Sequence, residues 1–68
     1  MSTTIPEREQ ARARIERDLF VSAPDVAAVI GLSMGLVYAG LRDGTIPSVR
    51  LGQRYRIPSA WVRQQAGL

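Results

Sequence analysis

The chain has 68 residues, which is enough for one small domain with a minimal core. It contains neither cysteine nor histidine, which excludes disulfides and zinc sites built from these residues. Its net charge is +3, and all nine basic residues are arginines. No apolar run approaches the ~20 residues of a membrane span and no signal peptide is visible, so we expect a cytoplasmic protein.

The charged residues are unevenly distributed along the chain. Residues 1–19 contain four arginines and four acids, whereas the region from Gly44 to the end contains four arginines and no acid. A basic region of this kind is typical of a phosphate-binding surface. Two explanations account equally well for the use of arginine instead of lysine. One is the composition bias of a GC-rich genome, and the other is the bidentate binding of phosphate by a guanidinium.

The first predicted element is a helix from Thr4 to about Arg17. Thr4 would cap its amino terminus, Pro6 would lie in the first turn, and Glu7 would complete a capping box. Charged residues cover most of this helix and leave only a thin apolar stripe at four-residue spacing. The stripe comprises Ala11, Ile15 and Leu19.

Two ion pairs at i,i+4 spacing are expected on this helix, Arg12–Glu16 and Arg14–Asp18. We interpret the helix as a solvated element that leans on the core through Ile15, because such a thin stripe cannot bury much surface alone. The alternative is a helix that binds a partner.

A short apolar connection, Asp18–Val21, is predicted to run extended and to pair with a hairpin farther along the chain. The next helix begins at Ser22-Ala23-Pro24-Asp25, which combines an S-x-x-D capping box with a proline in the first turn. Gly31 is expected to end this helix. The residues expected to share its apolar face are Val26, Ala27 and Ile30.

The following helix is predicted from Met34 to about Arg42, with Ser33 as its cap. Gly44 and then Pro47 stop it. At ~100° per residue, one side of the helix is apolar and is expected to face the core. That side comprises Leu36, Val37, Gly40 and Leu41. The outward side comprises Gly35, Tyr38, Ala39 and Arg42.

The two helices that flank Gly31 have the length and spacing of a helix-turn-helix, in which the start of the second helix enters the major groove of DNA. The candidate DNA-contacting residues there are Ser33, Met34, Gly35, Tyr38, Ala39 and Arg42. This set is poor in the arginine, asparagine and glutamine side chains that read base edges. We therefore expect modest direct readout, supplemented by DNA shape and by several copies binding side by side.

The segment Ser48–Ile57 is predicted to form a β-hairpin with Gly52 at its tip. A two-residue turn would give the pairs Leu51–Arg54 and Val49–Arg56, and a three-residue tip would give Leu51–Tyr55 and Val49–Ile57. The second arrangement leaves one face fully apolar. We prefer it because strand register normally follows the buried face.

Four polar side chains of the hairpin are candidate DNA contacts: Arg50, Gln53, Arg54 and Arg56. In the preferred register Arg50 and Arg56 share one face and Arg54 lies at the tip. A solvated strand face is the alternative, but three arginines without a nearby acid repel each other unless an anion neutralises them. A last helix begins near Pro58, and we assign Trp61 to the core rather than to base stacking.

The stretch from Phe20 to Val62 resembles the small excisionase-type DNA-binding domains of the MerR-like winged helix-turn-helix group. The matching segments are Val21-Ser22-x-x-Asp25-Val26-Ala27-x-x-Ile30-Gly31-Leu32-Ser33, Val37-Tyr38, Gly44-x-Ile46-Pro47 and Val49-Arg50-Leu51-Gly52-x-Arg54-Tyr55-Arg56-Ile57-Pro58. The resemblance implies a mainly α fold with a small β-hairpin, a recognition helix over residues 33–42 and a DNA-contacting wing over residues 50–56. Met34-Gly35 departs from the family pattern, in which polar or basic residues are common there.

The resemblance also implies a domain organisation and a function. Residues 1–19 would form an extra charged helix and residues 20–68 the winged helix-turn-helix domain. The expected function is that of a phage-encoded excisionase, or recombination directionality factor, which binds attachment-site DNA in several copies, bends it and directs an integrase toward excision. A small MerR-like transcriptional regulator is the alternative. A MerR-type activator normally carries a long coiled coil after its winged domain, so a 68-residue chain favours the excisionase.

The expected partners are double-stranded DNA, an integrase and further copies of the chain. No cofactor, metal, membrane or small-molecule ligand is expected. We do not expect an enzyme, because six carboxylates scattered among arginines form neither a paired-acid nor a metal-ligand pattern. A module that binds only proteins is the other class left open, with the amino-terminal helix as its contact surface.

Overall fold

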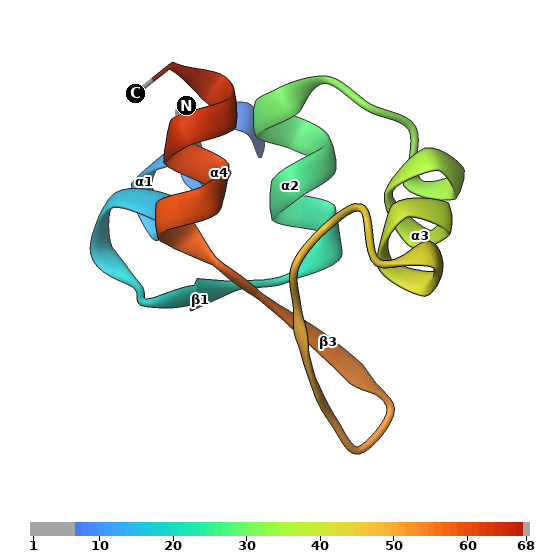
Figure 1. Ribbon diagram of the computed structural model, residues 1–68. Coiled ribbons are helices and arrows are strands. Elements are labelled where there is room, and N and C mark those ends of the chain that lie inside the picture. Colours follow the sequence, from blue (N-terminus) through green and yellow to red (C-terminus); the bar gives the residue numbers. More distant parts are fainter. Residues whose placement is uncertain (1–6, 68) are drawn as a thin grey trace, which may run out of the picture.

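A computed structural model of the protein describes residues 7–67. This part of the chain forms four helices and one three-stranded antiparallel sheet, which confirms the mainly α class with a small β component and is compatible with a small helix-turn-helix-like fold (Figure 1). The elements in chain order are α1 (Glu7–Arg17), β1 (Phe20–Val21), α2 (Ala23–Ile30), α3 (Met34–Asp43), β2 (Val49–Leu51), β3 (Arg54–Pro58) and α4 (Ser59–Ala66). The predicted cap at Thr4 and the proline at position 6 lie outside the described residues.

Helix α1 is largely exposed and leans on the common core through Ala11 and Ile15, which agrees with the interpretation of a solvated helix. Ala11 and Ile15 are fully buried, and α1 packs against α2 and α4. The prediction that Leu19 continues this stripe was wrong, because α1 ends at Arg17 and Leu19 is 84% exposed in the connection to β1. A domain boundary after residue 19 stays a prediction, although the core lies on both sides of it.

The core is small and consists mainly of aliphatic side chains from all four helices, β1, β3 and the segment after α3. Its buried members are Ala11, Ile15, Val21, Ala23, Val26, Val29, Val37, Leu41, Ile46, Ile57 and Val62. Trp61 is half-buried and packs against this cluster, as predicted. Leu36 was wrongly assigned to the core: it is 61% exposed, because α3 buries only the narrower face of Val37, Gly40 and Leu41.

The turn between α2 and α3 has the predicted chemistry. Gly31 ends α2 with a φ of 84°, and its N–H donates to the Ala27 carbonyl at 2.9 Å. The Ser33 hydroxyl accepts a hydrogen bond from the Leu36 N–H at 3.2 Å and thereby caps α3. The chain bends by 118° between the two helices, within the ~90–120° range of helix-turn-helix pairs.

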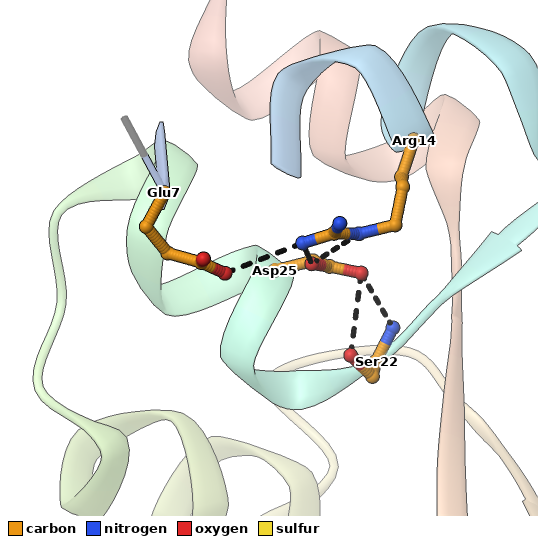
Figure 2. A network of polar contacts seen from close by, with 4 residues as sticks. All are labelled: Glu7, Arg14, Ser22 and Asp25. Carbon is orange, nitrogen blue, oxygen red and sulfur yellow. Dashed lines mark hydrogen bonds and ion pairs between the residues drawn. The ribbon is translucent and has the colours of Figure 1, made fainter. Parts of the chain in front are cut away.

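The amino-terminal turn of α2 is joined to α1 by a partly buried ion pair (Figure 2). Arg14 donates to Asp25 Oδ1 from Nε at 2.8 Å and from Nη2 at 2.5 Å, and it also contacts Glu7 at 3.3 Å. The other Asp25 oxygen accepts from the N–H and the hydroxyl of Ser22, at 3.5 and 3.2 Å. Asp25, only 4% exposed, thus completes the predicted capping box of α2 and fixes α1 beside it.

The predicted ion pairs within α1 had mixed outcomes. Arg12 and Glu16 lie 3.8 Å apart, as expected, with both side chains exposed. The pairing of Arg14 with Asp18 was wrong, because Arg14 turns toward Asp25 and Asp18 accepts instead from Arg17 Nε at 3.0 Å. The ion pair of Arg14 with Asp25 in α2 therefore replaces the predicted i,i+4 pair with Asp18.

The connection before α2 pairs with the hairpin, as predicted. β1 lies antiparallel to β3, with Phe20 opposite Pro58 and Val21 opposite Ile57. β3 is the central strand of the order β1-β3-β2, so the hairpin is attached to the helical body through its second strand. The distal part of the hairpin projects beyond the helices (Figure 1).

The preferred hairpin register was wrong. The observed pairs are Val49–Arg56, Arg50–Tyr55 and Leu51–Arg54, which leave a two-residue turn of Gly52 and Gln53. Gly52 has a φ of 64°, the positive value that a type II′ turn requires at its first central position. All three residues of β2 are exposed, so this strand has no buried face that could set the register. The turn geometry sets it instead.

Among residues 7–67, no single helix is long and apolar enough to cross a membrane, and only the sharply bent pair of α2 and α3 has the necessary combined length and composition.

Candidate nucleic-acid interface

The outward face of α3 is available for contact with a ligand. Five of the six residues predicted to contact DNA from this region are exposed, and Ala39 is half-buried. The exposed residues are Ser33, Met34, Gly35, Tyr38 and Arg42. A Cβ added at Gly35 would find nothing nearer than the Ser33 hydroxyl at 4.0 Å, so the start of α3 presents nearly bare backbone.

The hairpin distributes its arginines over two faces. Directly opposed residues of an antiparallel pair project to the same face, so Arg54 and Arg56 share a face with Leu51 and Val49. Arg50 lies on the other face, where its guanidinium carbon is 5.5 Å from the centre of the Tyr55 ring. This corrects the expectation that Arg50 and Arg56 share a face.

Tyr55 connects the hairpin with α3. Its ring centre lies 6.4 Å from that of Tyr38, with an angle of 58° between the ring planes. Beside this pair is an open pocket of about 250 Å³, which we call the α3–hairpin pocket. Its lining residues are Ser22, Ala23, Pro24, Tyr38, Gln53, Arg54, Tyr55 and Arg56. The predicted contacts at positions 38, 53, 54 and 56 are thus brought together.

Sequence reasoning missed Tyr55 and the start of α2 as parts of this surface. Tyr55 was assigned to a buried hairpin face, and its position between two arginines was the only available signal for a surface role. The contribution of Ser22, Ala23 and Pro24 depends on the packing of the hairpin beside α2, which no local pattern indicates.

The charged side chains fall into two groups. Three arginines of α1 contact carboxylates: Arg12 contacts Glu16, Arg14 contacts Asp25, and Arg17 contacts Asp18. By contrast, Arg42, Arg50 and Arg54 form no ion pair with any residue between 7 and 67. Arg8 at the start of α1 likewise forms no ion pair within these residues, so the positive charge outside ion pairs is concentrated on α3 and the hairpin but not confined to them.

Two further arginines of the basic carboxyl-terminal region have contacts within the fold. Arg63 donates to the Ile15 carbonyl at 2.7 Å and so binds the end of α1. Arg56 is half-buried and donates to the Phe20 carbonyl at 3.4 Å. The Arg17 hydrogen bond lowers the pKa of Asp18, and the positive charge of Arg56 adds to this effect. The expectation that no acid lies near the hairpin arginines was therefore wrong for Arg56.

Apart from Met34 and Tyr38 on α3, the large exposed apolar side chains of the described chain lie in two places. Leu19, Phe20, Val49 and Leu51 line a depression between the α1–β1 connection and the hairpin. Leu32 and Leu36 border a second depression, lined also by Ile30, Ile46 and Trp61. Exposed apolar clusters often mark contact surfaces, and neither cluster was predicted.

Comparison of the chain with protein-family models, with curated proteins and with solved structures found no match. The resemblance to excisionase-type domains therefore stays a prediction. Within residues 7–67, no group of three or more acidic, histidine or cysteine side chains could hold a metal ion.

Proposed function

We propose that this protein binds double-stranded DNA as a winged helix-turn-helix. Helix α3 would enter the major groove, and the β2–β3 hairpin would act as the wing on the adjacent backbone or minor groove. The observation that carries this proposal is the separation of charge: three of the four arginines on α1 contact acids, whereas Arg42, Arg50 and Arg54 do not. Polyanionic DNA would neutralise them and release counterions.

The local geometry of α3 supports this orientation. The sharp bend after α2 and the Ser33 cap leave the amino-terminal turn of α3 exposed, and Gly35 allows DNA to approach the backbone closely. Only Ser33, Tyr38 and Arg42 on this face can hydrogen bond to bases through their side chains. We therefore propose that the wing supplies most of the affinity and that DNA shape contributes to specificity.

Substitution of Gly35 with glutamate tests the orientation of α3. The added side chain points into open space, and a negative charge in the first turn favours the helix, so the variant is expected to be at least as stable as the wild type. The same charge would face DNA phosphates and weaken duplex binding by at least about tenfold. Gly35→Gln is the control of equal size without charge. Equal duplex affinities of the two variants, measured by fluorescence anisotropy, would exclude α3 from the interface.

The finer proposal is an architectural role as an excisionase that acts in several copies beside an integrase. It is supported by the weak set of base-reading side chains on α3, because a protein with few direct readers needs repeated sites and partner contacts to select its target. The test is an in vitro excision assay with a candidate integrase and its attachment sites. Stimulation of excision is expected. Tight promoter binding without stimulation would instead indicate a small MerR-like regulator.

A further inference from the structure

We propose that the α3–hairpin pocket is a binding site for one phosphate group, which in the bound state is a single phosphate of the DNA backbone. This inference rests on the proposed function and makes it more specific, because it assigns one phosphate to a pocket shared by α2, α3 and the hairpin. The pocket is bounded by Tyr38 from α3 and by Arg54 and Tyr55 from the hairpin.

The pocket concentrates hydrogen-bond donors that lack other partners. The guanidinium of Arg54 is exposed and contacts no carboxylate of the described chain. The phenol groups of Tyr38 and Tyr55 likewise have no hydrogen-bond partner among residues 7–67. A guanidinium binds two phosphate oxygens at once, and phenol hydroxyls donate to a third, so these groups match the acceptor set of one phosphate.

The charges around the pocket also select for an anion. Its lining contains Arg54 and Arg56 and no acidic residue. The adjacent depression toward α1 contains the same two arginines and Arg14, but also three acids, Glu7, Asp18 and Asp25. An anion placed there would meet three carboxylates, whereas in the α3–hairpin pocket it meets none.

A phosphate in this pocket would fix the position of the wing relative to α3. Tyr38 belongs to the helix that enters the groove, and Arg54 belongs to the hairpin. A ligand held by both ties the two elements to one point of the DNA backbone. The affinity would then depend on the distance between that phosphate and the major groove, which varies with DNA shape. Such a dependence would supply specificity to a helix with few base-reading side chains.

The first test uses inorganic phosphate as the probe, without DNA. The full-length ¹⁵N-labelled protein is titrated with sodium phosphate at constant ionic strength, with sodium chloride as the reference. Shifts of backbone amides are expected at residues 22, 23, 25, 38 and 53–56. They are expected to vanish in Arg54→Ala and to persist in Arg12→Ala, which removes the same charge from α1. Shifts that are absent, or that appear equally near every arginine, would refute the site.

The second test uses a duplex and the variant Tyr38→Phe, which keeps the ring against Tyr55 and removes only the hydroxyl. We expect duplex binding to weaken by at least about tenfold, the loss of one hydrogen bond to a charged group. Arg54→Lys should retain more affinity than Arg54→Ala, since it keeps the charge but loses the bidentate contact. Wild-type affinity in Tyr38→Phe, together with unlocalised phosphate shifts, would refute the site and leave DNA binding intact. Localised phosphate shifts in a protein that binds no duplex would refute the proposed function and retain the anion site.

Discussion

Replacement of Ile15 by alanine is expected to destabilise the protein by about 2–5 kcal/mol. Ile15 is fully buried between α1 and the rest of the core, and its carbonyl accepts the hydrogen bond of Arg63. The per-residue range for globular proteins gives a chain of this length a total stability of roughly 3–10 kcal/mol, so the loss is a large share of it. Thermal unfolding followed by circular dichroism should show a Tm lower by more than about 10 °C.

Leu19→Ala is the matched control, because it removes a similar aliphatic side chain only four residues away. Leu19 is almost fully exposed, so its removal should change the stability by no more than about 0.5 kcal/mol. If Ile15→Ala were as stable as Leu19→Ala, α1 would be dispensable for the core. That result would support the predicted boundary after residue 19 as a true domain boundary.

The helices were predictable from the sequence because their signals are local. Ser22 and Asp25 form the capping box of α2, Gly31 ends it in the left-handed region, and Ser33 caps α3 as its position indicates. Each of these interactions involves residues within a few positions of one another. The predicted ends of α2 and α3 therefore agree closely with the structure.

The errors concern contacts between elements. The hairpin register was predicted from an apolar face that would be buried, but the hairpin projects into solvent and its turn decides the pairing. Leu36 carries the periodicity of a core residue, yet it is 61% exposed. Arg14 has an i,i+4 partner in the sequence and contacts Asp25 instead. The strand register, the exposure of a side chain and the partner of an arginine all depend on how the elements pack against each other. Helical periodicity does not specify this packing.

The candidate interface was predictable residue by residue but not as an arrangement. The exposed positions on α3 and the hairpin follow from periodicity and turn chemistry. The contact between Tyr38 and Tyr55, and the pocket beside it, depend on the observed register. The engagement of Arg56 and Arg63 with backbone carbonyls likewise requires the folded chain. The sequence predicted the charge of the surface but not which arginines remain free.

The second large effect is expected for the double variant Arg50→Ala/Arg54→Ala. These arginines lie on opposite faces of the hairpin and contact no carboxylate of residues 7–67, so their removal should leave the fold intact. The loss of two phosphate contacts should weaken duplex binding about 10- to 100-fold at 0.1 M salt. Fluorescence anisotropy with a labelled random-sequence duplex measures this loss, and circular dichroism verifies that the variant is folded.

The control is Arg8→Ala/Arg12→Ala, which lowers the net charge by the same amount on α1. Both side chains are exposed, and Arg12 already lies beside Glu16. Duplex affinity is expected to fall less than about threefold, because charges outside the contact surface are largely screened. Equal losses in the two double variants would mean that the net charge drives binding, without a defined surface.

The dependence of duplex affinity on salt concentration tests the central claim most directly. For the wild type, log K should fall linearly with log salt concentration, with a slope of about −0.9 per phosphate contacted. The slope should become shallower by about 2 units in Arg50→Ala/Arg54→Ala and stay unchanged in Arg8→Ala/Arg12→Ala. A wild-type protein without salt-dependent binding, or a hairpin variant with the wild-type slope, would contradict the assignment of α3 and the hairpin as a DNA-binding surface.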